Sequence, residues 1–142
     1  MFRLFFILFL LTSPVFAGGH VHLLFHIGQT EGGRLYTGGT ILNDSQVVVK
    51  EGYVVVVPLD KACYPGKPVL QVFGALSPGE KTVFHVSLER GAEGYRLVSV
   101  GAVDDMGYSL PVTDDTAPVI ARRMKSERLK CLSARHLIMN ER

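Results

Sequence analysis

Three residues near the start of the chain, Gly18, Gly19 and His20, have the types and order needed to bind a metal ion. If the chain began at Gly18, its free amine, two deprotonated amide nitrogens and the imidazole of His20 would supply four nitrogens in one plane. Cu(II) and Ni(II) favour such a square-planar set. His22 falls on the same side of an extended strand as His20 and is a further candidate ligand. The alternative is that these histidines, with His26, are polar residues on the solvent face of an edge strand.

The metal hypothesis depends on where the mature chain begins. Met1 to Leu11 carries one positive charge, Arg3, and then an apolar run, and Pro14 interrupts the run shortly before Ala17. This pattern is typical of a cleaved secretory signal peptide. The apolar run is shorter than the ~20 residues that a spanning helix needs. We therefore expect residues 1–17 to be removed, leaving no stable membrane span and a periplasmic or secreted protein. The residue types at 18–20 resemble the amino-terminal copper and nickel motif.

The mature chain would be one compact domain of 142 − 17 = 125 residues. Removal of Arg3 leaves 14 basic residues against 13 acidic ones. A nearly neutral chain argues against a general nucleic-acid binder, so an electrostatic partner would have to meet a local patch.

The two cysteines, Cys63 and Cys131, are an even number in a chain with an export signal. In an oxidising compartment this predicts one disulfide that ties the C-terminal segment to the rest of the domain. The alternatives are a metal-bound cysteine pair or two free thiols, and two isolated cysteines make a poor zinc set.

Short segments of β-formers separated by turn residues cover most of the chain. Between His20 and Pro111 this spacing predicts an immunoglobulin-like antiparallel β-sandwich over residues 18–112. The run from Val47 to Leu59 is almost entirely β-forming, so we place it centrally in a sheet, where its edges are covered. We expect residues 20–27 to form an exposed edge strand that could accept a partner strand.

Residues 113–142 predict a basic C-terminal helix. Asp114, Asp115 and Thr116 offer oxygens for the N-cap, and Pro118 is tolerated in a first turn. Apolar residues at helical spacing, among them Ile120 and Met124, share a stripe with Cys131, and we expect this stripe to face the sandwich. The helix also carries a set of basic residues that could bind an acidic protein or an anionic envelope surface. They are Arg122, Arg123, Lys125, Arg128, Lys130 and Arg135, and the alternative is a simply solvated face.

Two turn sequences suggest a family resemblance. The segment from Gly39 to Ser45, GTILNDS, and the segment from Leu76 to Lys81, LSPGEK, followed by Phe84, resemble the small immunoglobulin-like modules of bacterial envelope proteins. The FxLYD and late-embryogenesis-abundant-like groups are similar over about residues 36–88, although the FxLYD sequence itself does not occur. The resemblance implies an interaction or scaffold domain without conserved catalytic residues.

Nothing in the sequence indicates catalysis. Asp104 and Asp105 precede Gly107 in a typical turn, and Asp114 and Asp115 are explained by a helix start. His85 and His136 are isolated, and no nucleophile elbow or phosphate-binding loop occurs. We therefore expect a non-enzymatic accessory or interaction module of the bacterial envelope, with another envelope protein as its partner. The alternatives are a periplasmic copper- or nickel-binding protein and an inhibitor of a foreign hydrolase. We expect no cofactor other than Cu(II) or Ni(II) in the first of these.

Overall fold

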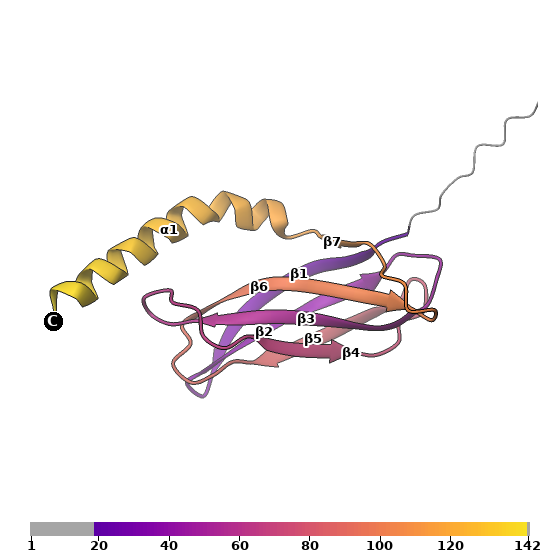
Figure 1. Cartoon of the computed structure of the whole chain (residues 1–142), viewed down its shortest axis with the longest axis horizontal. Coiled ribbons are helices and arrows are strands. Elements are labelled where there is room, and N and C mark those ends of the chain that lie inside the picture. Colours follow the sequence, from indigo (N-terminus) through magenta and orange to yellow (C-terminus); the bar gives the residue numbers. More distant parts are fainter. Residues whose placement is uncertain (1–18, 142) are drawn as a thin grey trace, which may run out of the picture.

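The computed structural model describes residues 19–141, so the signal-peptide prediction for residues 1–17 and the predicted ligand Gly18 lie outside the described residues. The described chain forms seven strands followed by one helix (Figure 1). These elements are β1 (Val21–Glu31), β2 (Arg34–Asn43), β3 (Val49–Leu59), β4 (Val69–Phe73), β5 (Lys81–Ser87), β6 (Gly94–Asp104), β7 (Val112–Asp114) and α1 (Ala117–Asn140).

The strands form two sheets that pack face to face. One has the order β5-β2-β1-β7 and the other β4-β3-β6. Neighbouring strands are antiparallel except β1 and β7, which are parallel. Strands β1, β2 and β5 occupy the places of A, B and E in an immunoglobulin sandwich, and β3 and β6 those of C and F. The mainly β fold with a C-terminal helix is confirmed, and β3 is central as predicted.

The core lies between the two sheets and is built by alternating residues. In β3, Val54 and Val56 are fully buried, while Tyr53, Val55 and Val57, which alternate with them, face outward. The opposite sheet contributes Ile41 and Phe84. Gly52 of β3 is required by this packing, because a Cβ there would lie 2.1 Å from the ring of Phe73.

A buried side chain builds the turn after β2. Asn43 is fully buried and donates hydrogen bonds to the carbonyl oxygens of Val47 (2.8 Å) and Leu76 (3.0 Å). Its own Oδ1 accepts from the backbone N–H and the hydroxyl of Ser45, at 3.0 and 2.6 Å. Ser45 fixes the side chain of Asn43, and Asn43 bonds to Leu76. The turn in the segment GTILNDS is therefore joined to the turn in the segment LSPGEK.

A bulge in β1 changes which side chains face the core. Leu23 pairs with Ile41 and Phe25 with Thr40, so β1 has one extra residue at this point. Before the bulge, Leu23 is buried; after it, Phe25 is 51% exposed and His26 turns toward the other sheet. The expectation that His26 shares a face with His20 and His22 is wrong, because strict alternation ends at the bulge.

Helix α1 stands away from the sandwich over most of its length (Figure 1). Every residue from Ala117 to Lys130 is exposed, including Met124 at 60%, and no helix residue is fully buried. The expectation that the stripe of Ile120, Met124 and Cys131 packs on the sandwich is therefore wrong for its first part. Periodicity indicates a face but does not bring that face into contact, and here only the disulfide end is held.

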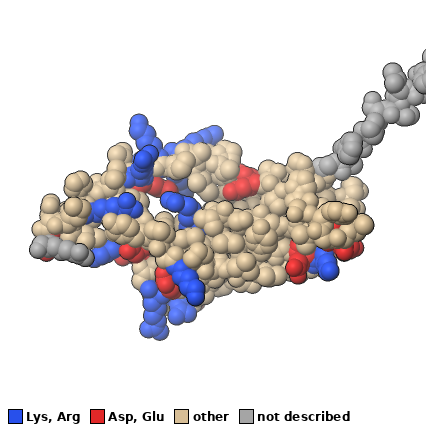
Figure 2. All heavy atoms as spheres, viewed as in Figure 1, with Lys and Arg blue, Asp and Glu red and all other residues tan. Residues whose placement is uncertain are grey.

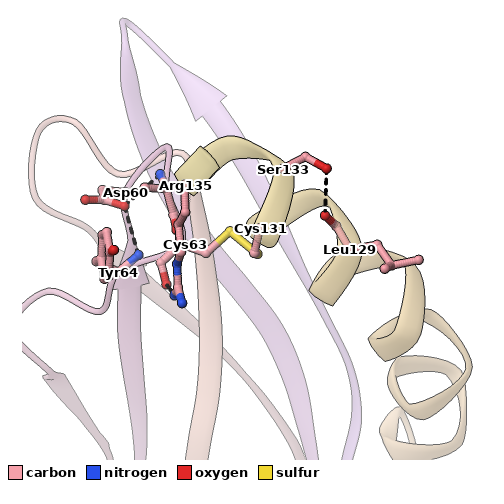
Figure 3. Close-up of a disulfide and its surroundings, with 8 residues drawn as sticks. Asp60, Cys63, Tyr64, Leu129, Cys131, Ser133 and Arg135 are labelled. Atoms are coloured by element: carbon pink, nitrogen blue, oxygen red, sulfur yellow. Dashed lines mark hydrogen bonds between the residues drawn. A yellow bond between two sulfur atoms is a disulfide. The ribbon is translucent and has the colours of Figure 1, made fainter. Parts of the chain in front are cut away.

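The predicted disulfide between Cys63 and Cys131 is confirmed, with a Cα–Cα distance of 5.6 Å (Figure 3). Cys63 lies in the loop after β3 and has a positive φ of 62°. Arg135, one turn beyond Cys131, donates to the carbonyl oxygens of Ala62 (3.0 Å) and Cys63 (3.3 Å). Its guanidinium also lies 4.4 Å from the centre of the Tyr64 ring. These contacts fix the loop to the helix at one end of the sandwich.

Candidate interaction surfaces

The outer face of the three-stranded sheet exposes apolar side chains where an isolated sandwich normally carries polar ones. Tyr53 of β3 pairs with Val72 of β4, and Val55 pairs with Leu70, so their side chains are neighbours on this face. Leu70 is 59% exposed and Val72 is 53% exposed. We name this surface the apolar sheet face, and its members are Tyr53, Val55, Val57, Leu70, Val72 and Val98.

A second apolar surface lies on the outer side of the four-stranded sheet. It is a shallow hollow of about 270 Å³, which we name the outer groove. Phe25 and Ile27 line one side and Val83 the other, while Tyr36 and His85 stack with ring centroids 4.9 Å apart. The groove exists because the bulge in β1 turns Phe25 and Ile27 outward. Sequence reasoning missed it, since residues 20–27 show no signal for the position of the bulge.

His26 of β1 and Tyr95 of β6 form a contact between the two sheets. The Nδ1 of His26 lies 2.8 Å from the hydroxyl of Tyr95, while its Nε2 is buried without a hydrogen-bond partner among the described residues. Desolvation lowers the pKa of His26 from its usual 6.5, and the carboxylate of Asp114 partly opposes this. Desolvation likewise raises the pKa of Tyr95, against a hydrogen bond from Thr37. The folded protein therefore favours a neutral imidazole.

The structure brings His20 and His22 together at the start of the four-stranded sheet. Their ring centroids are 6.1 Å apart, and His20 Nδ1 lies 3.2 Å from the hydroxyl of Thr113. His22 contacts the Asp115 carboxylate at 3.0 Å. Gly19 has a packing role, because a Cβ would lie 2.1 Å from Ser45 Cα.

No group of three or more His, Cys, Asp or Glu residues within 19–141 is arranged to hold a metal ion. The predicted set of Gly18, Gly19, His20 and His22 is different in kind, because it uses the backbone nitrogens of a free N-terminus. It stays a prediction.

The predicted basic residues of α1 do not act as one group. Arg135 is used inside the molecule, at the disulfide. The other five are exposed and, at 3.6 residues per turn, are distributed around the helix rather than along one face. Figure 2 shows most of the visible Lys and Arg at the end of the molecule where the helix lies. The five exposed basic residues of α1 are Arg122, Arg123, Lys125, Arg128 and Lys130.

The paired carboxylates support the backbone. Asp104 accepts hydrogen bonds from the N–H groups of Met106 (3.0 Å) and Tyr108 (2.8 Å), as expected for a turn. Asp114 ends β7 and accepts from the N–H of Thr116 at 2.8 Å. Thr116 is the N-cap residue of α1, although its side chain makes no capping bond to the helix.

Comparison with known proteins assigns no family to the chain. No family model matches the chain, and no curated protein matches it. A solved structure described as IrmA from Escherichia coli is similar in shape, with a TM-score of 0.44 and 10% identity. The likeness covers 68% of this chain and 90% of that one, and it carries no argument about function. The FxLYD and late-embryogenesis-abundant-like resemblance stays a prediction. Among the described residues, no helix is long and apolar enough to span a membrane.

Proposed function

We propose that this protein is a non-enzymatic interaction module of the bacterial envelope, and that it binds another envelope protein. The observation that carries the proposal is the apolar sheet face. Monomeric proteins seldom expose contiguous apolar patches, and such patches commonly mark binding surfaces. Covering the exposed half of Leu70 or Val72 would contribute about 1 kcal/mol for each side chain.

The compartment and the non-enzymatic character have separate support. The Cys63–Cys131 disulfide is compatible with an oxidising location outside the cytoplasm. The carboxylates that could have served in catalysis, Asp104 and Asp114, are hydrogen-bonded to backbone N–H groups of their own turns. Neither pair lines one of the two hollows found on the described chain.

Photo-cross-linking in the producing cell tests the proposal. A photoreactive amino acid at position 53, in the middle of the apolar sheet face, should give a discrete cross-linked adduct. Changing Leu70→Lys and Val72→Lys together should remove this adduct, because two charges would have to be buried in the interface. Met106→Lys combined with Tyr108→Lys is the matched control, since both side chains are exposed in the turn after β6 and belong to neither apolar surface. Absence of an adduct, or an adduct insensitive to the Leu70 and Val72 changes, would contradict the proposal.

The second candidate is a periplasmic copper- or nickel-binding protein. The observation that favours it is the pairing of the His20 and His22 rings, which would place a second imidazole near an N-terminal site. The candidate requires Gly18 to carry a free amine, so it depends on cleavage after Ala17. Metal uptake by the mature protein tests it, as described below.

A further inference from the structure

One side of β1 is left without a partner strand after its first residues. Strand β7 pairs only with Val21–Leu23, and the last bond on this side runs from the N–H of Asp115 to the carbonyl oxygen of Leu23. From Phe25 to Glu31, no residue of the described chain pairs with this side of the strand. The predicted edge at 20–27 is thus wrong in its first half. We name the unpaired segment Phe25–Glu31 the free edge.

Helix α1 begins at one end of the free edge, and Cys131 fixes it at the end of the sandwich toward which β1 runs. It begins directly after the Asp115 bond, and Cys131 is bonded to Cys63 in the loop after β3. That loop lies at the same end of the sandwich as the β1–β2 turn (Figure 1). The helix from Ala117 to Cys131 is about 21 Å long. The strand from Leu24 to Glu31 is about 23 Å long, so the two match.

The helix brings unpaired positive charge to this edge. Five Lys and Arg residues lie between Arg122 and Lys130, and Glu127 is the single acidic residue of α1. Ion pairs within 19–141 involve His22 alone, so none of these five cations is neutralised by a described neighbour. These five charges span about 12 Å along the helix, and their field would attract an acidic segment bound beside β1.

The side chains of the free edge determine which residues of a bound segment should be apolar. Phe25 and Ile27 point to the outer face and are 51% and 53% exposed. A strand added beside β1 would place every second side chain on the same face, next to these two residues. Such a strand gains most when those alternate residues are apolar.

We propose that the free edge binds an extended segment of a partner protein, in which apolar residues alternate with others and acidic residues are enriched. The segment continues the line of β7, pairs with the backbone of Phe25–Glu31, covers Phe25 and Ile27, and has its carboxylates near α1. Adding a strand to an open sheet edge is an established mode of peptide recognition. The inference rests on the proposed function only in treating the protein as an interaction module.

The test uses peptides selected on the oxidised, full mature protein. A random heptapeptide display library should yield sequences in which apolar residues alternate and acidic residues are frequent. A synthetic copy of the enriched peptide should slow amide hydrogen exchange in residues 25–31. The same peptide with alternate backbone amides N-methylated should lose binding, because it cannot pair with the strand.

Charge reversal separates the helix from the rest of the surface. Lys125→Glu combined with Arg128→Glu should weaken peptide binding about tenfold at low ionic strength, and added salt should reduce the difference. Lys81→Glu on β5, at the far edge of the same sheet, is the matched control and should change little.

Three results would overturn the inference: no enriched peptide, enriched basic peptides, or protection outside residues 25–31. Binding of the helix to vesicles of anionic lipid in place of any peptide would also count against it. Persistence of the cross-link at position 53 in any of these cases would leave the proposed function standing.

Discussion

Removal of the disulfide by Cys63→Ser and Cys131→Ser should destabilise the sandwich by only about 1.2 kcal/mol. The bond closes a loop of 68 residues, and in the chain-entropy model a loop of this length is worth about 4.4 kcal/mol in the unfolded chain. That full value applies only when the native protein holds both cysteines in place without the bond. Here Ala117 to Lys130 is exposed, and without the bond only the surface contacts of Arg135 hold the far part of the helix. We expect these contacts to be too weak to keep the helix in place, so the released helix would move about its attachment at β7.

Without the bond, the helix of the native state also gains conformational entropy, and this gain offsets much of the entropy gained by the unfolded chain. In the native state the disulfide restrains a segment of about 17 residues, from Asp114 to Cys131. The entropy of each loop depends on the logarithm of its length, so the net change in the free energy of unfolding depends on the ratio of 68 to about 17. This ratio gives about 1.2 kcal/mol.

Urea unfolding followed by far-ultraviolet circular dichroism measures the effect, because the chain has no tryptophan. Hydrogen exchange should show faster exchange in α1 and unchanged exchange in β2 and β3. A loss near 4 kcal/mol would refute the reasoning, since it would mean that the helix stays docked without the bond.

Three further predictions concern single side chains. Because the pKa of His26 is lowered from 6.5, the wild-type free energy of unfolding should fall as pH drops through 6.5, and His26→Gln should remove this part of the pH dependence. Asn43→Ala should cost about 3 kcal/mol in urea unfolding, since it leaves buried groups of two turns unpaired, whereas Asp44→Ala beside it should cost under 0.5 kcal/mol. On the metal hypothesis, the mature protein should bind one Cu(II) by native mass spectrometry and His20→Ala should abolish this uptake; retained stoichiometric binding would exclude the N-terminal site.

Local sequence signals were sufficient to predict most of the strands. Turn residues such as Asn43 and Gly79 mark where strands end, and the dense β-formers of β3 predict a central strand. The disulfide followed from the count of cysteines and the export signal. The strands depend on residues close in sequence, and two cysteines can form only one intramolecular disulfide.

Features that depend on contacts between distant elements were not predictable. The bulge that turns Phe25 outward is set by how β1 fits against both β2 and β7, and no residue type at 23–25 marks it. The parallel pairing of β7 with β1 likewise has no local signal. The spacing of Ile120 and Met124 predicted a packed helix, but the residues from Ala117 to Lys130 are exposed and the helix is held at its disulfide end.

The disulfide also determines how the protein would respond to a mechanical load. Under tension between Gly19 and Glu141, force would pass from Cys63 directly to Cys131, so strands β4 to β7 would not lie in the loaded path. The 68 residues of the loop closed by the disulfide would not extend, which shortens the fully stretched chain by about 230 Å. The free edge of β1 lies outside this closed loop, in the segment that carries the load. A partner bound to the free edge would therefore be attached to the part of the chain under tension, whereas strands β4 to β7 would bear none of this load.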